Sequence, residues 1–516
     1  MSVQANNNAS LKSTQAVAVI GSGAMGAGIA QIAAVAGHDV MMFDVSSGAA
    51  ESAAGKLRST LLKLAEKSRM TVADAEAACG RLHAVDDLAE LASCALVVEA
   101  IIENLDAKRQ LFLELEKIVS DDCVLASNTS SISITSIAAP LRLPQRLVGM
   151  HFFNPAPLMA LVEVVSGLAT SPEVAAQIFA TSAAWGKVPV YARSTPGFIV
   201  NRVARPFYAE ALRLLGEQAA DAATLDVVMR EAGGFRMGAF ELMDLIGHDV
   251  NYAVTKSVFD AYYQDPRFTP SLIQLELVNA GRLGRKTGVG FFRYGPEVVS
   301  PKGRSEPSTS LPNRIVVYPA GPISDALLSR LEASGTPFTR ATAPHSDGRL
   351  FDANDTAIHL TDGRSATQVA TETGQGELAL VDLMFDARNS TRIACAFADQ
   401  ASPAARGSAI GLFQGAGFSV SVLDDVPGLA VMRTVSMLAN EAADAVNQGV
   451  CDAAGADLAM QKGVNYPRGP LAWADDIGVQ RVMTVLDNLS RIYGEDRYRC
   501  SPLIRRKVFS GQPFHA

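Results

Sequence analysis

A glycine-rich loop near the start of the chain restricts the fold more than any other stretch of the sequence. It begins at Gly21, directly after the apolar run 16–20, which is typical of a buried parallel strand, and a helical pattern follows it. Here Gly21 would make the tight turn, Gly23 would let the backbone approach a pyrophosphate, and Gly26 would pack helix against strand. The sequence therefore predicts a dinucleotide-binding Rossmann domain, with phosphate-contacting positions at Gly21, Gly23, Ala24, Met25 and Gly26.

The stretch 37–44 reads as a second strand and ends in Asp44, which lies 18 residues after Gly26. A carboxylate about 20 residues beyond the glycines commonly binds the ribose 2′-hydroxyl of the adenosine. The same carboxylate would repel a 2′-phosphate, so the sequence favours NAD over NADP. The alternative is that the glycines serve only a turn, because a GxGxxG pattern by itself is weak evidence.

Two further apolar runs, 95–101 and 124–127, read as buried strands that open into polar loops. In doubly wound sheets, ligands bind outside the carboxyl ends of the strands. The polar residues placed to line such a site are Glu103, Ser127, Asn128 and Ser130.

The stretch 51–69 has a helical pattern with two different sides. Leu57, Leu61 and Leu64 recur at helical spacing on one side. The other side carries Lys56, Thr60, Lys63 and Lys67. Such a side is usually solvated, but on an acidic protein it can also receive phosphates, and the spacing favours neither interpretation.

The stretch 149–165 reads as two short apolar strands joined by a turn at 154–157. In an antiparallel pair closing at this turn, His151 and Glu163 would stand opposite one another, with Cβ atoms about 5 Å apart. A carboxylate at one ring nitrogen fixes the tautomer of a histidine and stabilises its protonated form. The pair is a candidate base with its orienting acid. A buried histidine satisfied by a chance carboxylate is the structural alternative.

Composition excludes several classes of protein. A net charge of −8 argues against general nucleic-acid binding, which relies on basic surfaces. Residues 1–13 lack the features of a secretion signal, and no apolar run reaches the roughly 18 residues that span a bilayer. The six cysteines are scattered without CxxC pairs, which suits a reduced compartment better than a zinc or disulfide framework. We expect a cytoplasmic protein with no membrane, nucleic-acid or metal partner.

Comparison of the chain with itself reveals a repeat. Helical patterns resume after Thr195-Pro196-Gly197, from Phe198 to Leu215, and the features of this region recur 231 residues later. The recurring pairs are Pro196 and Pro427, Arg202 and Arg433, Glu210 and Glu441, Asp226 and Asp457, and Asp244 and Asp475. In the second copy Met432 replaces Asn201, and the Arg285–Gly288 hook has no counterpart, so we expect this copy to have lost ligand contacts.

With 516 residues the chain is expected to hold several domains, in an α/β fold. The stretch after Gly295 is a linker by its prolines and serines. Four strand-like runs follow it, at 314–318, 356–360, 378–382 and 392–396. We take that region as a reduced Rossmann-like module that binds nothing. The predicted order is a Rossmann domain at 14–193, an all-α domain at 194–295, a linker at 296–313, the module at 314–425 and a second all-α domain at 426–511.

The motifs together resemble those of the L-3-hydroxyacyl-CoA dehydrogenases. The resemblance covers roughly residues 15 to 294, in the order of the family. It rests on the stretches GSGAMGAGIAQIAA, VVEAIIENLDAK, ASNTSSISIT, HFFNPAPLMALVEVV, TPGFIVNR and GRLGRKTGVGFF. It implies NAD-dependent oxidation of the 3-hydroxyl of an acyl-CoA, by a Rossmann domain with a 6-phosphogluconate-dehydrogenase-like helical domain. The layout is similar to that of bacterial 3-hydroxybutyryl-CoA and 3-hydroxyadipyl-CoA dehydrogenases, the latter from phenylacetate degradation.

The resemblance also implies roles for individual residues. His151 corresponds to the catalytic base and Glu163 to its partner, and Ser130 and Asn201 to polar residues that contact the substrate. Residues that correspond to NAD contacts are Asp44, Glu103, Lys108, Asn154 and Lys286. Thr60, where the family has serine, and Lys67 correspond to CoA contacts.

Other functions remain open at the level of sequence. One is a dehydrogenase of a free hydroxy acid or sugar acid, which needs no CoA patch. Another is a non-catalytic NAD-binding structural relative. Single-copy members of the family dimerise through the helical domain, so the repeat implies either an internal pseudo-dimer or a homodimer.

Overall fold

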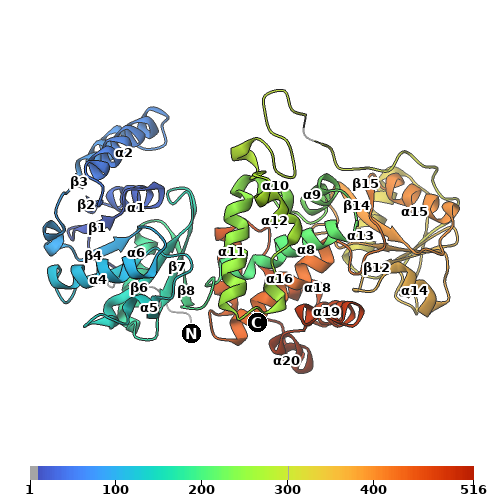
Figure 1. The fold of residues 1–516 in the computed structure, drawn as a ribbon. Helices are drawn as coiled ribbons and strands as arrows, with labels where there is room; N and C mark the ends of the chain where they lie inside the picture. Colours follow the sequence, from blue (N-terminus) through green and yellow to red (C-terminus); the bar gives the residue numbers. More distant parts are fainter. Residues whose placement is uncertain (1–9, 300, 516) are drawn as a thin grey trace. The chain divides into compact units, whose positions relative to one another are not determined.

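The computed structural model describes residues 10–299 and 301–515, and the chain divides into two compact units (Figure 1). The first unit runs up to Arg202 and includes Ala445–Val464, and the second comprises Val203–Asp444 and the chain from Asn465 onward. Residues 1–9, within the region predicted to carry no secretion signal, and Ser300 of the predicted linker lie outside the described residues.

The first unit is built on an eight-stranded sheet in the order β3-β2-β1-β4-β5-β6-β7-β8. All neighbouring strands are parallel except β6 and β7, which are antiparallel. Strands β1, β4 and β5 are buried along their whole length, as expected for a sheet with helices on both faces. The strands are β1 Val17–Ile20, β2 Val40–Phe43, β3 Leu82–Ala84, β4 Leu96–Glu99, β5 Val124–Ser127, β6 Leu147–Phe152, β7 Leu161–Ser166 and β8 Val188–Arg193.

Helices connect these strands as in a Rossmann fold. Figure 1 shows α2 as a long arm that projects from the sheet. Leu57 and Leu61 of this helix are buried, Leu64 is half-buried, and the predicted basic side is exposed. The helices are α1 Ala24–Val35, α2 Ala49–Glu66, α3 Val72–Gly80, α4 Leu105–Ile118, α5 Ile134–Ala138 and α6 Pro172–Ala184.

The second unit contains most of the two helical copies, which match element by element. In the first copy the elements are α7 Val200–Val203, α8 Arg205–Gly216, α9 Ala222–Glu231, α10 Ala239–Ile246, α11 His248–Ala261 and α12 Leu272–Asn279. Their counterparts are α16 Val431–Asn447, α17 Ala453–Gly463, α18 Pro470–Ile477, α19 Val479–Tyr493 and α20 Pro502–Ser510. Residues 431–445 are all buried, so α16 forms the centre of this helical packing.

The structure corrects the prediction of one continuous helix from Phe198 to Leu215. The helix breaks at Ala204, and a new one begins at Arg205. Pro206 causes the break, because it has no N–H to donate to the carbonyl group four residues earlier. In the second copy no proline interrupts the corresponding helix.

The two copies exchange one helix each. Within the first unit, α17 of the second copy packs on β7 and β8, and Gly463 lies so close to Leu161 that a Cβ would meet its side chain at 2.7 Å. The N–H of Arg193 donates to the carbonyl of Val450 at 2.9 Å. Within the second unit, α9 packs on the strand β14 (Arg392–Phe397), which belongs to the second sheet of the chain. The equivalent backbone bond joins the N–H of Asp424 to the carbonyl of Ala219 at 2.8 Å. Each copy therefore contributes to covering the other half of the chain.

A second sheet, of seven strands, occupies the region predicted as a reduced Rossmann-like module. Its order is β10-β9-β11-β12-β13-β14-β15, with α13 Pro322–Ser334, α14 Ala366–Thr373 and α15 Pro403–Gly415 (Figure 1). The sequence predicted four of the strands and missed β10, β11 and β15, which are short. The strands are β9 Ile315–Val317, β10 Thr339–Arg340, β11 Phe351–Ala353, β12 Thr356–Leu360, β13 Leu378–Val381, β14 Arg392–Phe397 and β15 Ser419–Val422.

Over the described part of the chain, no helix has the length and apolar character needed to cross a membrane.

Candidate active site

The predicted pair of His151 and Glu163 forms across β6 and β7. The two residues are direct partners in the antiparallel register, and the imidazole Nδ1 lies 2.6 Å from the Glu163 Oε2. His151 is 5% exposed and Glu163 is fully buried. Because the hydrogen bond to the carboxylate uses Nδ1, the pair fixes which ring nitrogen is left for other partners.

Glu163 also holds the start of the next helix. Its second oxygen, Oε1, accepts hydrogen bonds from the backbone N–H groups of Ile199 at 3.0 Å and Val200 at 2.9 Å. These groups precede Asn201, which is half-buried. One buried carboxylate therefore fixes both the histidine and the backbone that carries Asn201.

The remaining ring nitrogen of His151, Nε2, has no hydrogen-bond partner among the residues that the structure describes. The ring lies against aromatic neighbours, with centroid distances of 4.5 Å to Phe153 and 5.7 Å to Phe198. The side chain is therefore held on three sides, and Nε2 is the atom that can accept a proton from a bound alcohol.

The glycine loop has the geometry that the sequence predicted. Gly21 has φ +96°, a conformation that L side chains rarely adopt, and a Cβ on Gly26 would collide with the Gly21 carbonyl. A Cβ on Gly23 would meet nothing within 4 Å. The loop is therefore closed on its protein side and open at Gly23, where backbone can approach a phosphate group.

Asp44 lies directly after β2 and holds this loop. Its Oδ2 accepts from the backbone N–H of Ser22 at 2.7 Å and from the Ser22 hydroxyl at 2.6 Å, and its Oδ1 accepts from the N–H of Ser46 at 2.9 Å. Burial raises the pKa of the Asp44 carboxyl, but these hydrogen bonds outweigh burial and the pKa is lowered. The group is therefore a carboxylate at neutral pH.

A cleft of about 610 Å³ adjoins the loop and Asp44 within the first unit. Apolar side chains form much of its wall. Asp44 and Ser46 line it beside the glycine loop, and Gln110 and Glu114 line it from α4. A wall of this kind suits an adenine ring, with ribose near Asp44 and phosphate near Gly23. The apolar residues that line the cleft include Val45, Leu88, Ile101, Ile102 and Leu111. These features fit an adenine dinucleotide.

Glu103 orders the loop that contains Ser130. Its Oε1 accepts from the Thr129 hydroxyl at 2.7 Å and from the N–H groups of Ser130 at 2.9 Å and Ser131 at 3.1 Å. Burial raises the pKa of the Glu103 carboxyl, but the hydrogen bonds together with Lys108 outweigh burial, so the pKa is lowered. Glu103 and Ser130, which the sequence placed along the same edge of the sheet, therefore lie in hydrogen-bond contact.

Lys108 is buried and its ammonium group meets two carboxylates. Its Nζ lies 2.5 Å from the Glu99 Oε1 and 3.3 Å from the Glu103 Oε2. The other Glu99 oxygen accepts from the Ser127 hydroxyl at 2.6 Å. The sequence placed Ser127 near the site but missed Glu99, although an acid at the end of an apolar run was a visible signal. The contacts of Lys108 are with protein, and its role toward NAD stays a prediction.

The remaining predicted site residues lie apart from one another in the chain. Asn154 is exposed after β6, and Thr60 and Lys67 are exposed on α2, where the Thr60 hydroxyl donates to the Lys56 carbonyl at 2.9 Å. In the second unit Lys286 forms an ion pair with Asp249 at 2.5 Å. The described residues hold no cluster of histidine, cysteine and acidic side chains that could bind a metal.

A Rossmann sheet with an open glycine loop, an acid after the second strand and a buried histidine–glutamate pair defines an NAD-dependent dehydrogenase. The chain belongs to the 3-hydroxyacyl-CoA dehydrogenase family. Residues 16–195 match the family's NAD binding domain, residues 197–294 and 428–513 match its C-terminal domain, and residues 358–427 match the 3-hydroxybutyryl-CoA dehydrogenase reduced Rossmann-fold domain.

Some relatives match nearly the whole of this chain, and others match about half of it. The chain is 42% identical to a 3-hydroxyadipyl-CoA dehydrogenase of Escherichia coli over 96% of this chain and 97% of the relative. It is 42% identical to a probable 3-hydroxybutyryl-CoA dehydrogenase of Deinococcus radiodurans, covering 54% of this chain and 99% of that one. Its structure resembles the crystal structure of 3-hydroxybutyryl-CoA dehydrogenase from Escherichia coli K12, with a TM-score of 0.87, 41% identity, and coverage of 97% of this chain and 100% of that chain. The predicted family, fold class and cofactor are confirmed.

Proposed function

We propose that this chain oxidises the 3-hydroxyl group of an L-3-hydroxyacyl-CoA to a 3-oxo group, with His151 as the base. The observation that carries this proposal is the buried 2.6 Å hydrogen bond between His151 and Glu163, in the same sheet as the glycine loop. A histidine with Nδ1 held by a carboxylate and Nε2 available is suited to take a hydroxyl proton near neutral pH.

We assign a separate role in the reaction to each residue of the candidate site. A dinucleotide held by the glycine loop and Asp44 would supply the acceptor for the hydride of the substrate's C3. As the hydride leaves, His151 Nε2 takes the proton of the 3-hydroxyl, and the Glu163 carboxylate stabilises the imidazolium that forms. We assign Ser130 and Asn201 to holding the reacting alcohol in position, because a displacement of about 1 Å can cost on the order of a hundredfold in rate.

For the CoA part of the substrate we assign Thr60 and Lys67 on α2. The exposed basic side of this helix, which also carries Lys56 and Lys63, supports the assignment, since the chain as a whole has a net charge of −8. A local group of lysines on an acidic protein attracts phosphate groups. The names of the relatives support 3-hydroxybutyryl-CoA or 3-hydroxyadipyl-CoA as the substrate.

We further propose that the two helical copies form an internal pseudo-dimer and that the enzyme works in the cytoplasm. The exchanged helices α9 and α17 and the buried residues 431–445 of α16 support the first point. The second is supported by the six cysteines, all of which are free thiols.

An assay of NADH formation tests the proposed reaction. The full-length protein, NAD and a panel of L-3-hydroxyacyl-CoAs should give NADH, whereas free 3-hydroxybutyrate, which lacks CoA, should not. Turnover of the free acid at a rate comparable to that of its CoA ester would instead support a hydroxy-acid dehydrogenase. Absence of turnover with every ester would support a non-catalytic relative.

A further inference from the structure

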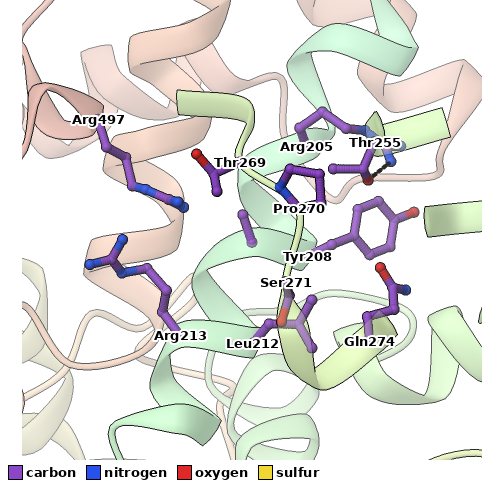
Figure 2. Close-up of a pocket in the computed structure, with 11 residues that line it drawn as sticks. Arg205, Tyr208, Leu212, Arg213, Thr255, Thr269, Pro270, Ser271, Gln274 and Arg497 are labelled. Carbon is purple, nitrogen blue, oxygen red and sulfur yellow. Dashed lines mark hydrogen bonds between the residues drawn. The ribbon is translucent and has the colours of Figure 1, made fainter. Parts of the chain in front are cut away.

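The helical part of the second unit contains a pocket that the proposed reaction leaves without a role. It has a volume of about 170 Å³ and lies between α8, α11, the start of α12 and the segment near Arg497 (Figure 2). Three arginines line it and no acidic residue does. The polar residues of its wall are Arg205, Arg213, Arg497, Thr255, Thr269, Ser271, Gln274 and Tyr208.

Arg205 is the unusual member of this group. It is 5% exposed, and its Nη1 donates to the Thr255 hydroxyl at 3.0 Å (Figure 2). Its guanidinium lies 4.9 Å from the centre of the Tyr208 ring. Its buried Nε has no hydrogen-bond partner, and none of the described carboxylates lies within ion-pair distance of Arg205. Burial lowers the pKa of the guanidinium, and neighbouring tyrosines oppose this effect.

A buried cation without a carboxylate is costly. Removing one member of a buried ion pair typically destabilises a protein, because the charge that stays behind is neither hydrated nor neutralised. The Arg205 guanidinium is such a buried charge, because no carboxylate among the described residues neutralises it. An anion that enters the pocket would supply the missing charge and accept the hydrogen bonds that remain unused.

The other two arginines add to the positive potential of the pocket. Arg213 forms a two-pronged bond with Glu495, at 2.7 Å for each contact. Arg497 lies 3.7 Å from Glu495 and 4.0 Å from Glu210. Figure 2 shows these two arginines on one side of the pocket and Arg205 with Thr255 on another. Neither of the two nearby carboxylates reaches Arg205.

The repeat-related position on α16 of the second copy shows what the pocket lacks. There Arg267, in the turn that corresponds to that of Arg497, forms buried ion pairs with Glu441 and Asp444. Asp444 lies 231 positions after Arg213, so the repeat places an arginine where the other half has a carboxylate. At one of the two repeat-related positions the protein therefore supplies a carboxylate, Asp444, and at the other, beside the pocket, it supplies a cation, Arg213.

We propose that this pocket binds a carboxylate group, with Arg205 as its principal donor. Arginine presents several N–H groups in a plane that matches a carboxylate, and burial strengthens such a contact. The Thr255 hydroxyl holds one arm of the arginine and leaves the others for the ligand.

The carboxylate can come from two sources, a substrate or a free acid. Arg205 follows Asn201 by four residues, and four residues of chain span at most about 14 Å, so the end of a short dicarboxylic acyl chain is one source. Two other arginines of the helical domain, Arg236 and Arg293, are exposed and therefore less suited to bind the carboxylate at the end of an acyl chain. This first possibility, here called the substrate arm, rests on the proposed function. The other source is a free dicarboxylate that binds without reacting.

Kinetics of the full-length enzyme test the substrate arm. The measured quantity is the ratio of kcat/KM for 3-hydroxyadipyl-CoA to that for 3-hydroxybutyryl-CoA, in the wild type and in Arg205→Leu, Arg205→Lys and the exposed control Arg236→Leu. We expect the ratio to fall at least about tenfold in Arg205→Leu, mainly through KM, with partial recovery in Arg205→Lys and no change in the control. Failure of the proposed function would appear differently, as absence of NADH formation by the wild type with both esters.

Thermal melting tests the free-acid arm. Adipate should raise the Tm of the wild type above the effect of potassium chloride at equal ionic strength, and this shift should be lost in Arg205→Leu. Thr255→Val, which removes only the hydroxyl that holds Arg205, serves where Arg205→Leu fails to fold. If the kcat/KM ratio of the two esters depends on Arg205, the bound carboxylate belongs to the substrate. If adipate raises the Tm through Arg205 but the kcat/KM ratio does not depend on Arg205, the bound carboxylate belongs to a free acid. If neither quantity differs between the wild type and the folded pocket variants, the proposal is wrong.

Discussion

Glu163 and Asp382 perform the same structural task in the two halves of the chain. Glu163 accepts hydrogen bonds from the N–H groups of Ile199 and Val200, and Asp382 accepts them from Ala430 at 2.9 Å and Val431 at 2.7 Å, which lie 231 positions further on. Each carboxylate is buried and holds the start of the first helix of its copy, α7 or α16. The duplication therefore extends into the sheet that precedes each helical domain.

The second half nevertheless lacks the proton-handling pair. Strands β13 and β14 are antiparallel like β6 and β7, and the N–H of Asp382 donates to the carbonyl of Ala394 at 2.9 Å. Asp382 thus stands across from an alanine, and among the described residues its carboxylate bonds to backbone N–H groups and to no histidine. The second half therefore keeps the antiparallel strands but has no histidine–carboxylate pair across them within the described residues. We expect one active site per chain.

The first prediction concerns the base. His151→Gln keeps a polar side chain of similar size but cannot take a proton, so kcat should fall by at least about a hundredfold. Binding of NADH, measured by its fluorescence, should stay within a fewfold of the wild type because the glycine loop is untouched. Near-normal turnover would remove His151 from the role of base. Glu163→Gln should also lower kcat, since it removes the charge that stabilises the imidazolium.

The second prediction concerns the choice of NAD. Asp44→Ala removes the carboxylate after β2, so the preference for NAD over NADP, taken as the ratio of kcat/KM, should fall about tenfold or more. Asp39→Ala, at an exposed acid one position before the same strand, is the matched control. If Asp44→Ala leaves the ratio of kcat/KM for NAD to that for NADP at the wild-type value, Asp44 does not contact the adenosine ribose.

The third prediction concerns CoA. Replacing Lys56, Lys63 and Lys67 together by glutamine should raise KM for an acyl-CoA about tenfold and weaken its dependence on salt, because phosphate contacts are electrostatic. Lys117→Gln on α4, also exposed, is the control. An unchanged KM with unchanged salt dependence would place the CoA phosphates elsewhere.

The fourth prediction concerns Asp382. Asp382→Ala leaves several buried N–H groups without an acceptor, which should lower the free energy of unfolding by about 2 kcal/mol or more in urea denaturation. Asp355→Ala, at an exposed acid of the same module, should change it little.

The stability of the wild type should also depend on pH through this group. Burial raises the pKa of Asp382 from 3.8 to about 6, although four backbone hydrogen bonds oppose the shift. The folded chain therefore holds this proton more tightly than the unfolded chain, and stability from this group is lost as pH rises from about 4 to 6. Asp382→Asn lacks the titration, so the stability advantage of the wild type over this variant should shrink across that interval. A difference that grows with pH would contradict the assignment.

The fifth prediction concerns the repeat. A chain that ends at Tyr294 lacks α17, which covers β7 and β8 in the first unit. The exposed apolar surface should drive self-association, with α9 of a second copy taking the place of α17. Light scattering should show a dimer for this short chain and a monomer for the full chain. A monodisperse monomeric short chain would count against the pseudo-dimer.

Local patterns in the sequence were sufficient for several parts of the site. The glycine loop, Asp44 and the pairing of His151 with Glu163 follow from spacings of a few residues, and the structure reproduces their geometry. Spacing could not show that Lys108 is buried between Glu99 and Glu103, because those contacts depend on how a helix packs against two strand ends. The three short strands of the second sheet were missed because their stability comes from neighbouring strands more than from their own composition.

The sequence by itself determined the family, the cofactor and the duplication, because motifs and repeats are properties of residue order. Only the tertiary structure revealed that each copy lends a helix to the other half, that Asp382 stands in for Glu163, and that Arg205 is a buried cation without a carboxylate. These features arise from contacts between residues separated by many positions in the chain. Burial and pairing of a charge are decided by such contacts, since they depend on which side chains surround it in space.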